Sequence, residues 1–194
     1  MRQTVPTDTG TLRADAARNV VQLRAAAIAS FHGRGLETPL AEIALAAGVT
    51  KGTIYHRFGG RLGLIDAVIG ELVAAPMHEI GERALGIDDP WHALATYITD
   101  RRDLHYREPA AVDALLMTYP ESAELVALAQ SATRTATELI RRAHDTAVLR
   151  PDFTTSDLYY ADVGNGLALR RLPKPSPEDY HRRTRFLLDG LRPH

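Results

Sequence analysis

The amino-acid sequence predicts an all-α protein, with a three-helix helix-turn-helix domain at the N-terminus, a larger helical domain after it, and about nine helices in total. Apolar residues recur at spacings of three and four along most of the 194 residues, which is the period of an amphipathic helix. No segment alternates apolar and polar residues as a half-buried strand does. In residues 40–58, two short helical patterns are separated by so few residues that only a tight turn fits between them.

The composition is that of an ordinary folded chain, with 45% hydrophobic and 24% charged residues. The absence of cysteine excludes disulfides, thiolate metal sites and cysteine nucleophiles. No apolar run approaches the roughly 20 residues that span a membrane, and the first residues lack the apolar core of a signal peptide. We therefore expect a cytoplasmic protein with no membrane partner.

The N-terminal segment is expected to contain an arm and one long helix. Residues 1–14 have no apolar periodicity and carry two arginines, a proline and a glycine, so we expect a flexible basic arm. A helical pattern begins at Asp15 and ends near Gly33, with an apolar face that includes Leu23, Ala27 and Phe31. This helix would support the helix-turn-helix and complete a DNA-binding domain over residues 15–60.

The helix-turn-helix pattern places a short cationic helix at the surface. Gly48 supplies the left-handed backbone that ends the first helix, and Thr50 can cap the second. Ile54 and Phe58, four residues apart, form the inner face of the second helix. Its exposed face then consists of hydrogen-bond donors, cations and one glycine, a surface suited to phosphates and base edges: Lys51, Gly52, Thr53, Tyr55, His56 and Arg57.

The charge distribution agrees with a nucleic-acid partner for the N-terminal part only. The formal net charge of the whole chain is −1. Residues 1–70 contain eight Lys and Arg against five Asp and Glu, a net charge of +3, and residues 71–194 carry a net charge of −4. The basic part coincides with the helix-turn-helix.

Residues 47–58 are similar to the turn and recognition helix of the tetracycline-repressor (TetR) family of bacterial transcription regulators, and the resemblance extends over residues 15–68. It implies that Thr50, Lys51 and Tyr55 hold phosphates, while Thr53 and the bare backbone at Gly52 approach base edges. At the start of the next helix the chain departs from the family pattern, but Arg61 can still meet a phosphate. The expected DNA-binding residues are Leu40, Thr50, Lys51, Gly52, Thr53, Tyr55, His56, Arg57 and Arg61.

The rest of the chain, residues 61–194, is expected to form a helical ligand-binding and dimerisation domain. It begins with a connector helix over residues 61–85, in which Pro76 should produce a kink or a break near residues 72–75. The three patterns that follow, over 89–107, 110–119 and 120–148, would line a small-molecule pocket if one exists. The first of them turns from apolar to polar along one face, which also fits a helix that leaves the core. The candidate ligand-binding residues are Trp91, Ile98, Arg101, His105, Met117 and Tyr119, of which Arg101 and His105 favour an anionic or hydrogen-bonding ligand.

The last two helical patterns, 155–172 and 176–191, have broad apolar faces that can hardly satisfy each other within one chain. A second copy of the pair would complete a four-helix bundle, so we expect a homodimer, as the resemblance also implies. The residues expected at the dimer interface are Leu158, Ala161, Asn165, Leu172, Tyr180, Thr184, Leu187 and Leu191.

No pattern in the chain indicates an enzyme, a cofactor or a metal. The eight histidines lack the spacing of a metalloprotease helix, and there is no nucleophile elbow and no phosphate-binding loop. The sequence therefore predicts a DNA-binding transcription regulator, a repressor released from a palindromic operator by a small-molecule ligand. Two alternatives stay open: a DNA-binding regulator without a small-molecule effector, and a helical enzyme.

Overall fold

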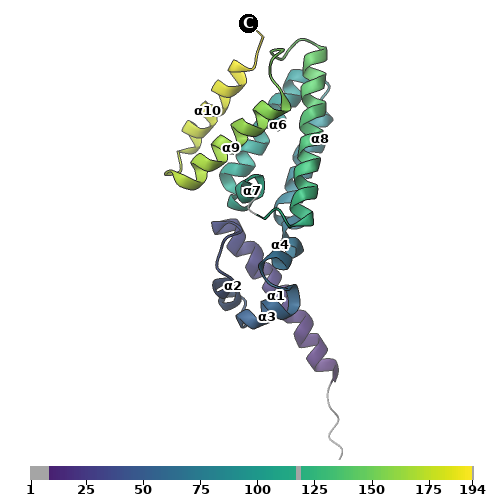
Figure 1. The fold of residues 1–194 in the computed structure, drawn as a ribbon, viewed down its shortest axis with the longest axis vertical. Helices are drawn as coiled ribbons and strands as arrows, with labels where there is room; N and C mark the ends of the chain where they lie inside the picture. The colour runs from purple at the N-terminus through teal and green to yellow at the C-terminus, as the bar shows by residue number, and fades with distance from the viewer. Residues whose placement is uncertain (1–8, 117–118, 194) are drawn as a thin grey trace, which may run out of the picture.

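The computed structural model describes residues 9–116 and 119–193, with side chains from residue 18 onward. All regular structure in these ranges is helical, which confirms the all-α prediction. Figure 1 shows α1 to α4 below a bundle formed by the later helices. Nine helices are present if α4, η1 and α5 count as one path, and their bounds are α1 Thr9–Arg34, α2 Leu40–Ala46, α3 Lys51–Phe58, α4 Arg61–Ile69, η1 Gly70–Ala74, α5 Ala75–Leu85, α6 Pro90–Arg107, α7 Pro109–Leu115, α8 Ala123–Asp145, α9 Thr155–Arg171 and α10 Pro177–Gly190.

Helix α1 starts earlier than the sequence analysis predicts. It begins at Thr9 rather than at Asp15, so the expectation of a flexible arm is wrong for residues 9–14. Those residues include Leu12, Arg13 and Ala14, which are good helix formers and extend a helix that is already nucleated by its packed C-terminal half. The first eight residues of the expected arm lie outside the described residues.

The three N-terminal helices enclose a small apolar core. Leu23 and Phe31 of α1, Ile43 of α2 and Ile54 of α3 are all fully buried. Gly48 has φ 67° at the turn between α2 and α3, a conformation that costs other residues free energy because of their Cβ. This turn and the Ile54 anchor fix the orientation of α3.

The connector path is helical throughout and contains one π-helical turn. The π turn, η1, lies immediately before Pro76, at the place where a kink or a break is expected from the sequence. Proline removes one backbone hydrogen bond and its ring crowds the carbonyl four residues earlier, and a π turn relieves both without ending the helix.

Close contact between α3 and α4 requires a glycine, which gives a stability prediction. A Cβ at Gly63 would collide with the carbonyl oxygen of Phe58, whereas a Cβ at Gly70 would meet nothing within 4 Å. We expect Gly63→Ala to lower the free energy of unfolding by about 2 kcal/mol or more, and Gly70→Ala to raise it by up to about 1 kcal/mol. Chemical denaturation of both variants measures the difference, and equal stability of the two would contradict the proposed close contact.

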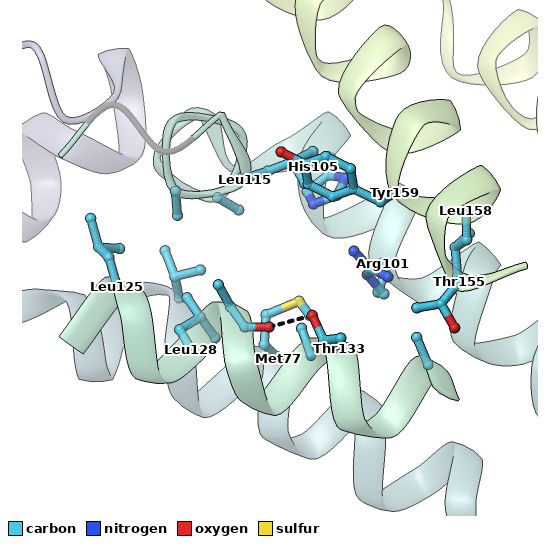
Figure 2. Close-up of a pocket in the computed structure, with 16 residues that line it drawn as sticks. Met77, Arg101, His105, Leu115, Leu125, Leu128, Thr133, Thr155, Leu158 and Tyr159 are labelled. Atoms are coloured by element: carbon cyan, nitrogen blue, oxygen red, sulfur yellow. Dashed lines mark hydrogen bonds between the residues drawn. The ribbon is translucent and has the colours of Figure 1, made fainter. Parts of the chain in front are cut away.

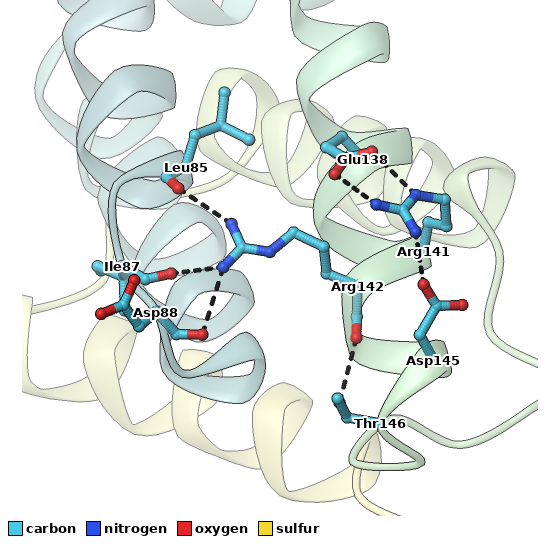
Figure 3. Close-up of polar contacts among 8 residues, drawn as sticks. All are labelled: Leu85, Ile87, Asp88, Glu138, Arg141, Arg142, Asp145 and Thr146. Carbon is cyan, nitrogen blue, oxygen red and sulfur yellow. Dashed lines mark hydrogen bonds and ion pairs between the residues drawn. The ribbon is translucent and has the colours of Figure 1, made fainter.

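The upper bundle packs α5, α6 and α8 around a common core that includes Leu94, Tyr97 and Leu139. Figure 3 shows how Arg142 of α8 closes the loop that follows α5: its guanidinium donates hydrogen bonds to the carbonyls of Leu85 (3.0 Å) and Ile87 (2.6 Å). These carbonyls lack helical partners, so a cation there stabilises the end of the helix. Among the helices described, none has the length and apolar character needed to cross a membrane.

Candidate DNA-binding surface and ligand cavity

Helix α3 presents an exposed polar face at the outer end of the N-terminal part. Lys51, Tyr55, His56 and Arg57 are exposed, while Ile54 on the opposite face is fully buried. The Lys51 ammonium lies 5.7 Å from the centroid of the Tyr55 ring, a cation–π contact that holds the two side chains near each other. The exposed face therefore combines a cation with a phenol hydroxyl at one end of the helix.

The N-terminus of α3 is open to an anion. Thr50 has the extended backbone of an N-cap but makes no side-chain capping hydrogen bond, and its hydroxyl lies 3.2 Å from that of Thr53. Gly52 adds no side chain over the first turn. Unpaired N–H groups at a helix start attract phosphate, so the first turn of α3 can receive a phosphate directly.

Two of the nine expected DNA-binding residues do not have side chains available for DNA. Leu40 is buried in the core of the N-terminal helices, because it starts α2 on the inner face. Arg61 donates hydrogen bonds to the carbonyls of Leu36 (2.6 Å) and Thr38 (2.8 Å). Its guanidinium thus fixes the loop between α1 and α2 instead of facing solvent.

A cavity of about 100 Å³ lies inside the upper bundle. Figure 2 shows Leu125, Leu128 and Thr133 of α8 on one side of it, with Arg101 and His105 of α6 on the other. The remaining lining is mostly alanine, valine, leucine and methionine side chains from η1, α5, α7, α8 and α9. The cavity is therefore mostly apolar, with its charged group on α6 and hydroxyl groups from Thr133, Thr155 and Tyr159.

The polar end of the cavity contains a buried ion pair. Arg101 and Asp162 approach to 3.0 Å, and both side chains are buried. Neither oxygen of the Asp162 carboxylate has a hydrogen-bond partner among the described residues. The Arg101 Nε and the His105 Nδ1 also lack one. Burial raises the pKa of Asp162, against the attraction of Arg101 and Arg102. Burial also lowers the pKa of His105 to about 3, with the same two arginines adding to the effect. His105 is therefore neutral at physiological pH.

The cavity contains two of the six expected ligand-binding residues, Arg101 and His105. Ile98 is buried beside it without lining it. Trp91 lies at the start of α6 under the guanidinium of Arg192, 3.8 Å from the ring centroid, and Tyr119 contacts the carbonyl of Leu36 at 3.4 Å. Neither of these lines the cavity, and Met117 lies outside the described residues. The sequence analysis also missed Asp162 and the alanine-rich face of α8.

Helix α7 connects the cavity to α1. Ala111, Ala114 and Leu115 line the cavity, while Asp113 accepts a hydrogen bond from the backbone N–H of Leu36 (2.7 Å). At the start of α7, Glu108 is hydrogen-bonded to His32 of α1. A change in the shape of the cavity that moves α7 must therefore also act on the end of α1 (Figure 1).

Half of the eight residues expected at a dimer interface are buried within the chain. Leu158, Tyr180, Thr184 and Leu191 are buried within the chain itself, so the prediction that they meet a second copy is wrong. Leu172 is 64% exposed, and Ala161, Asn165 and Leu187 are partly exposed. The outer face of the pair instead presents Tyr160 (68% exposed), Leu167 (44%) and Phe186 (65%), which were not predicted.

The described residues contain no group of three or more histidine, aspartate or glutamate side chains that is arranged to hold a metal ion. An exposed cationic helix on a helix-turn-helix, joined through α7 to a helical bundle with an internal cavity, defines a DNA-binding transcription regulator of bacterial type. Residues 23–68 match the model for "Bacterial regulatory proteins, tetR family". The helix-turn-helix domain is thus similar to that family, and the whole chain has the fold of TetR-type regulators.

Solved structures of such regulators match nearly the full length of the chain. A TetR regulatory protein from Mycobacterium vanbaalenii is 27% identical, with 94% of this chain and 99% of that chain covered and a TM-score of 0.53. The ketosteroid regulator KstR2 of Mycobacterium tuberculosis is 18% identical over 91% and 96% of the two chains, with a TM-score of 0.66. AibR, solved with isovaleryl coenzyme A and operator DNA, is 20% identical over 91% and 98%, with a TM-score of 0.65. No curated protein sequence is significantly similar to this chain.

Proposed function

We propose that this regulator is a homodimeric repressor that binds a palindromic operator through two copies of α3 and is released by a small molecule bound in the cavity. The exposed Lys51, Tyr55 and open helix start support phosphate contacts, and Thr53 lies on the same face for base edges. Two half-sites one helical turn apart, about 34–36 Å, would match a two-fold symmetric dimer. In this proposal the protein acts in the cytoplasm, without a cofactor and without catalytic activity.

The outer face of α9 and α10 supports the dimer. Tyr160, Leu167, Leu172 and Phe186 are large exposed apolar side chains on two adjacent helices, and such a patch on a folded chain is typical of an interface. A second copy of the pair would give a four-helix bundle with a two-fold axis. That axis would hold the two copies of α3 at a fixed spacing.

Charges on this face should separate the dimer. We expect the double variant Leu167→Glu/Phe186→Glu to be monomeric by analytical ultracentrifugation, because four carboxylates would be buried across the two-fold axis. Operator affinity should fall by at least about tenfold, since one half-site alone must then supply the binding. The matched control places the same charges away from this face, Leu45→Glu/Val21→Glu, at two exposed apolar positions in the N-terminal helices. A dimeric Leu167→Glu/Phe186→Glu protein would exclude this face as the interface.

The position of α7 is the observation that carries ligand release. One face of α7 lines the cavity, while Glu108 at its N-cap contacts His32 of α1 and Asp113 holds the backbone of the loop after α1 at Leu36. Asp113 also forms an ion pair with Arg170 of α9 at 3.0 Å. Gly35 has φ 90°, and a Cβ at this position would collide with the Asp113 carboxylate. A ligand that displaces α7 would change the spacing between the two α3 helices. If the ligand favours the changed spacing by only about 1–3 kcal/mol, operator binding becomes five- to 150-fold weaker.

The coupling can be tested by weakening the Asp113 contact. The operator is first selected from genomic fragments with the purified protein, and a ligand is taken from a thermal-shift screen of metabolites. We expect the ligand to weaken operator binding in fluorescence anisotropy, and Asp113→Asn to reduce that effect to less than about twofold while ligand affinity is kept. The control is Asp103→Asn, which removes a partly exposed carboxylate that faces His181. If every ligand that binds leaves operator affinity unchanged in the wild-type protein, the proposed release mechanism is wrong.

A further inference from the structure

The polar end of the cavity contains one more positive charge than negative charge. Arg101, Arg102 and Asp162 are all less than 10% exposed, and His105 is neutral because its pKa is about 3. Both arginines act electrostatically on Asp162 and on His105, so the three charges form one cluster. Two guanidinium groups thus share a single carboxylate.

Among the described residues, Arg102 donates hydrogen bonds only to neutral groups and forms no ion pair of its own. Its guanidinium donates hydrogen bonds to the hydroxyl of Thr184 (3.0 Å) and to the side-chain oxygen of Asn165 (3.0 Å). It also lies 5.4 Å from the centroid of the Tyr180 ring. These contacts use two of its nitrogens but do not neutralise its charge, and an uncompensated buried charge favours the binding of a counter-ion.

The side of this cluster that reaches the cavity is the cationic side. Arg101 and His105 line the cavity, whereas Asp162 does not. The Nε of Arg101 and the Nδ1 of His105 are buried without hydrogen-bond partners. A bound molecule therefore meets a positive potential at this end of the cavity, and an anion that reaches the Arg101 guanidinium would supply a hydrogen-bond acceptor and the missing charge.

The opposite part of the cavity selects for a small apolar body. The volume of the whole cavity, about 100 Å³, is smaller than the roughly 150 Å³ of an engineered cavity that takes up benzene. A second hollow of about 330 Å³ shares Met77, Leu128 and Ala132 with it. Methionine changes rotamer readily, so displacement of Met77 would provide the room that a ring requires.

We propose that the ligand of this cavity is a small monocarboxylate, with its carboxylate at Arg101 and His105 and an apolar body about the size of a benzene ring against Leu125, Leu128 and Ala132. This inference rests on the proposed function for the existence of a ligand, and it adds the ligand's chemical class. The carboxylate brings the charge of the cluster to zero without removing the Arg101–Asp162 pair. A neutral molecule of the same shape would fill the apolar part but leave the excess charge in place.

The test compares benzoate with benzamide, which has nearly the same shape and no charge, by isothermal titration calorimetry on the full-length protein without DNA. We expect benzoate to bind at least about tenfold more tightly than benzamide. Arg102→Gln removes the excess charge without touching the cavity lining, so it should weaken benzoate binding by about tenfold and leave benzamide unchanged. Arg142→Gln is the matched control, because it removes a partly buried guanidinium that holds the loop after α5, and both affinities should stay the same.

A second variant makes the test independent of the folding of Arg102→Gln. Asp162→Asn removes the only carboxylate of the cluster, so benzoate should raise the melting temperature of this variant more than that of the wild-type protein. Benzamide binding as tightly as benzoate, neither probe binding, or an Arg102→Gln protein with unchanged benzoate affinity would each overturn the inference. These measurements are made without DNA, so they test the ligand class separately from the proposed function. If benzoate binds but leaves operator affinity unchanged, ligand release is contradicted and the ligand class is still supported.

Discussion

Replacing Lys51 and Tyr55 together with alanine should weaken binding to every DNA sequence by about a hundredfold or more. Hydrogen bonds that involve charged groups contribute about 1.5–3 kcal/mol each, and about 1.4 kcal/mol corresponds to a factor of ten in affinity. Both side chains are exposed on α3, and neither belongs to the core. Because their expected partners are phosphates, the loss should be the same for specific and non-specific DNA.

The salt dependence distinguishes lost phosphate contacts from a damaged helix. If each of the two residues contacts one phosphate, the slope of log affinity against log salt should become shallower by about two in the double variant. Tyr55 also packs against Gly60, where an added Cβ would lie 3.3 Å from the ring, so Tyr55→Phe separates the hydroxyl from the ring. The matched control is Lys174→Ala, which removes the only other lysine from the segment between α9 and α10. A double variant with wild-type affinity and slope would exclude the proposed orientation of α3.

The recognition helix could be predicted from the sequence because its structure depends on local features. Gly48 and the Ile54–Phe58 spacing fix which face of α3 is inner, and the exposed residues follow from the helical period. Arg61 could not be placed this way, because its partners are carbonyls in a loop more than 20 residues earlier. A cation at the start of a helix beside a DNA-binding surface suggests a phosphate contact. Only the folded structure shows that the Arg61 guanidinium is already bonded to backbone carbonyls of the protein.

The cavity and the dimer surface were predicted less well because both depend on the rotation of α9. The buried row of α9 is Leu158, Asp162 and Gly166, whereas the sequence analysis placed Ala161 and Asn165 on the apolar face. An aspartate suggests an exposed face unless its partner is known, and the partner here is Arg101 on α6. With Asp162 turned inward, Tyr160 and Leu167 turn outward, so this one residue explains both the missed acid and the exposed apolar side chains of α9 that were not predicted.

The buried ion pair predicts the largest loss of stability from a single substitution. We expect Asp162→Ala to lower the free energy of unfolding by about 3–5 kcal/mol, because it leaves Arg101 buried without a charge partner beside the equally buried Arg102. Exposed pairs such as Arg141 with Glu138 contribute far less, because solvent screens their attraction. Glu138→Ala is therefore the matched control, and chemical denaturation of the two variants compares a buried carboxylate with an exposed one.

The double variant Arg101→Met/Asp162→Leu determines whether the loss in Asp162→Ala arises from the unpaired charge. Replacing both members of a buried pair with apolar side chains is often neutral or stabilising, so the double variant should recover most of the stability that Asp162→Ala loses. It should not recover benzoate binding, since the cationic end of the cavity is then absent. The double variant would thus be stable but unable to bind benzoate. A double variant as unstable as Asp162→Ala would show instead that the side-chain volume at α9, and not the charge, holds α6 and α9 together.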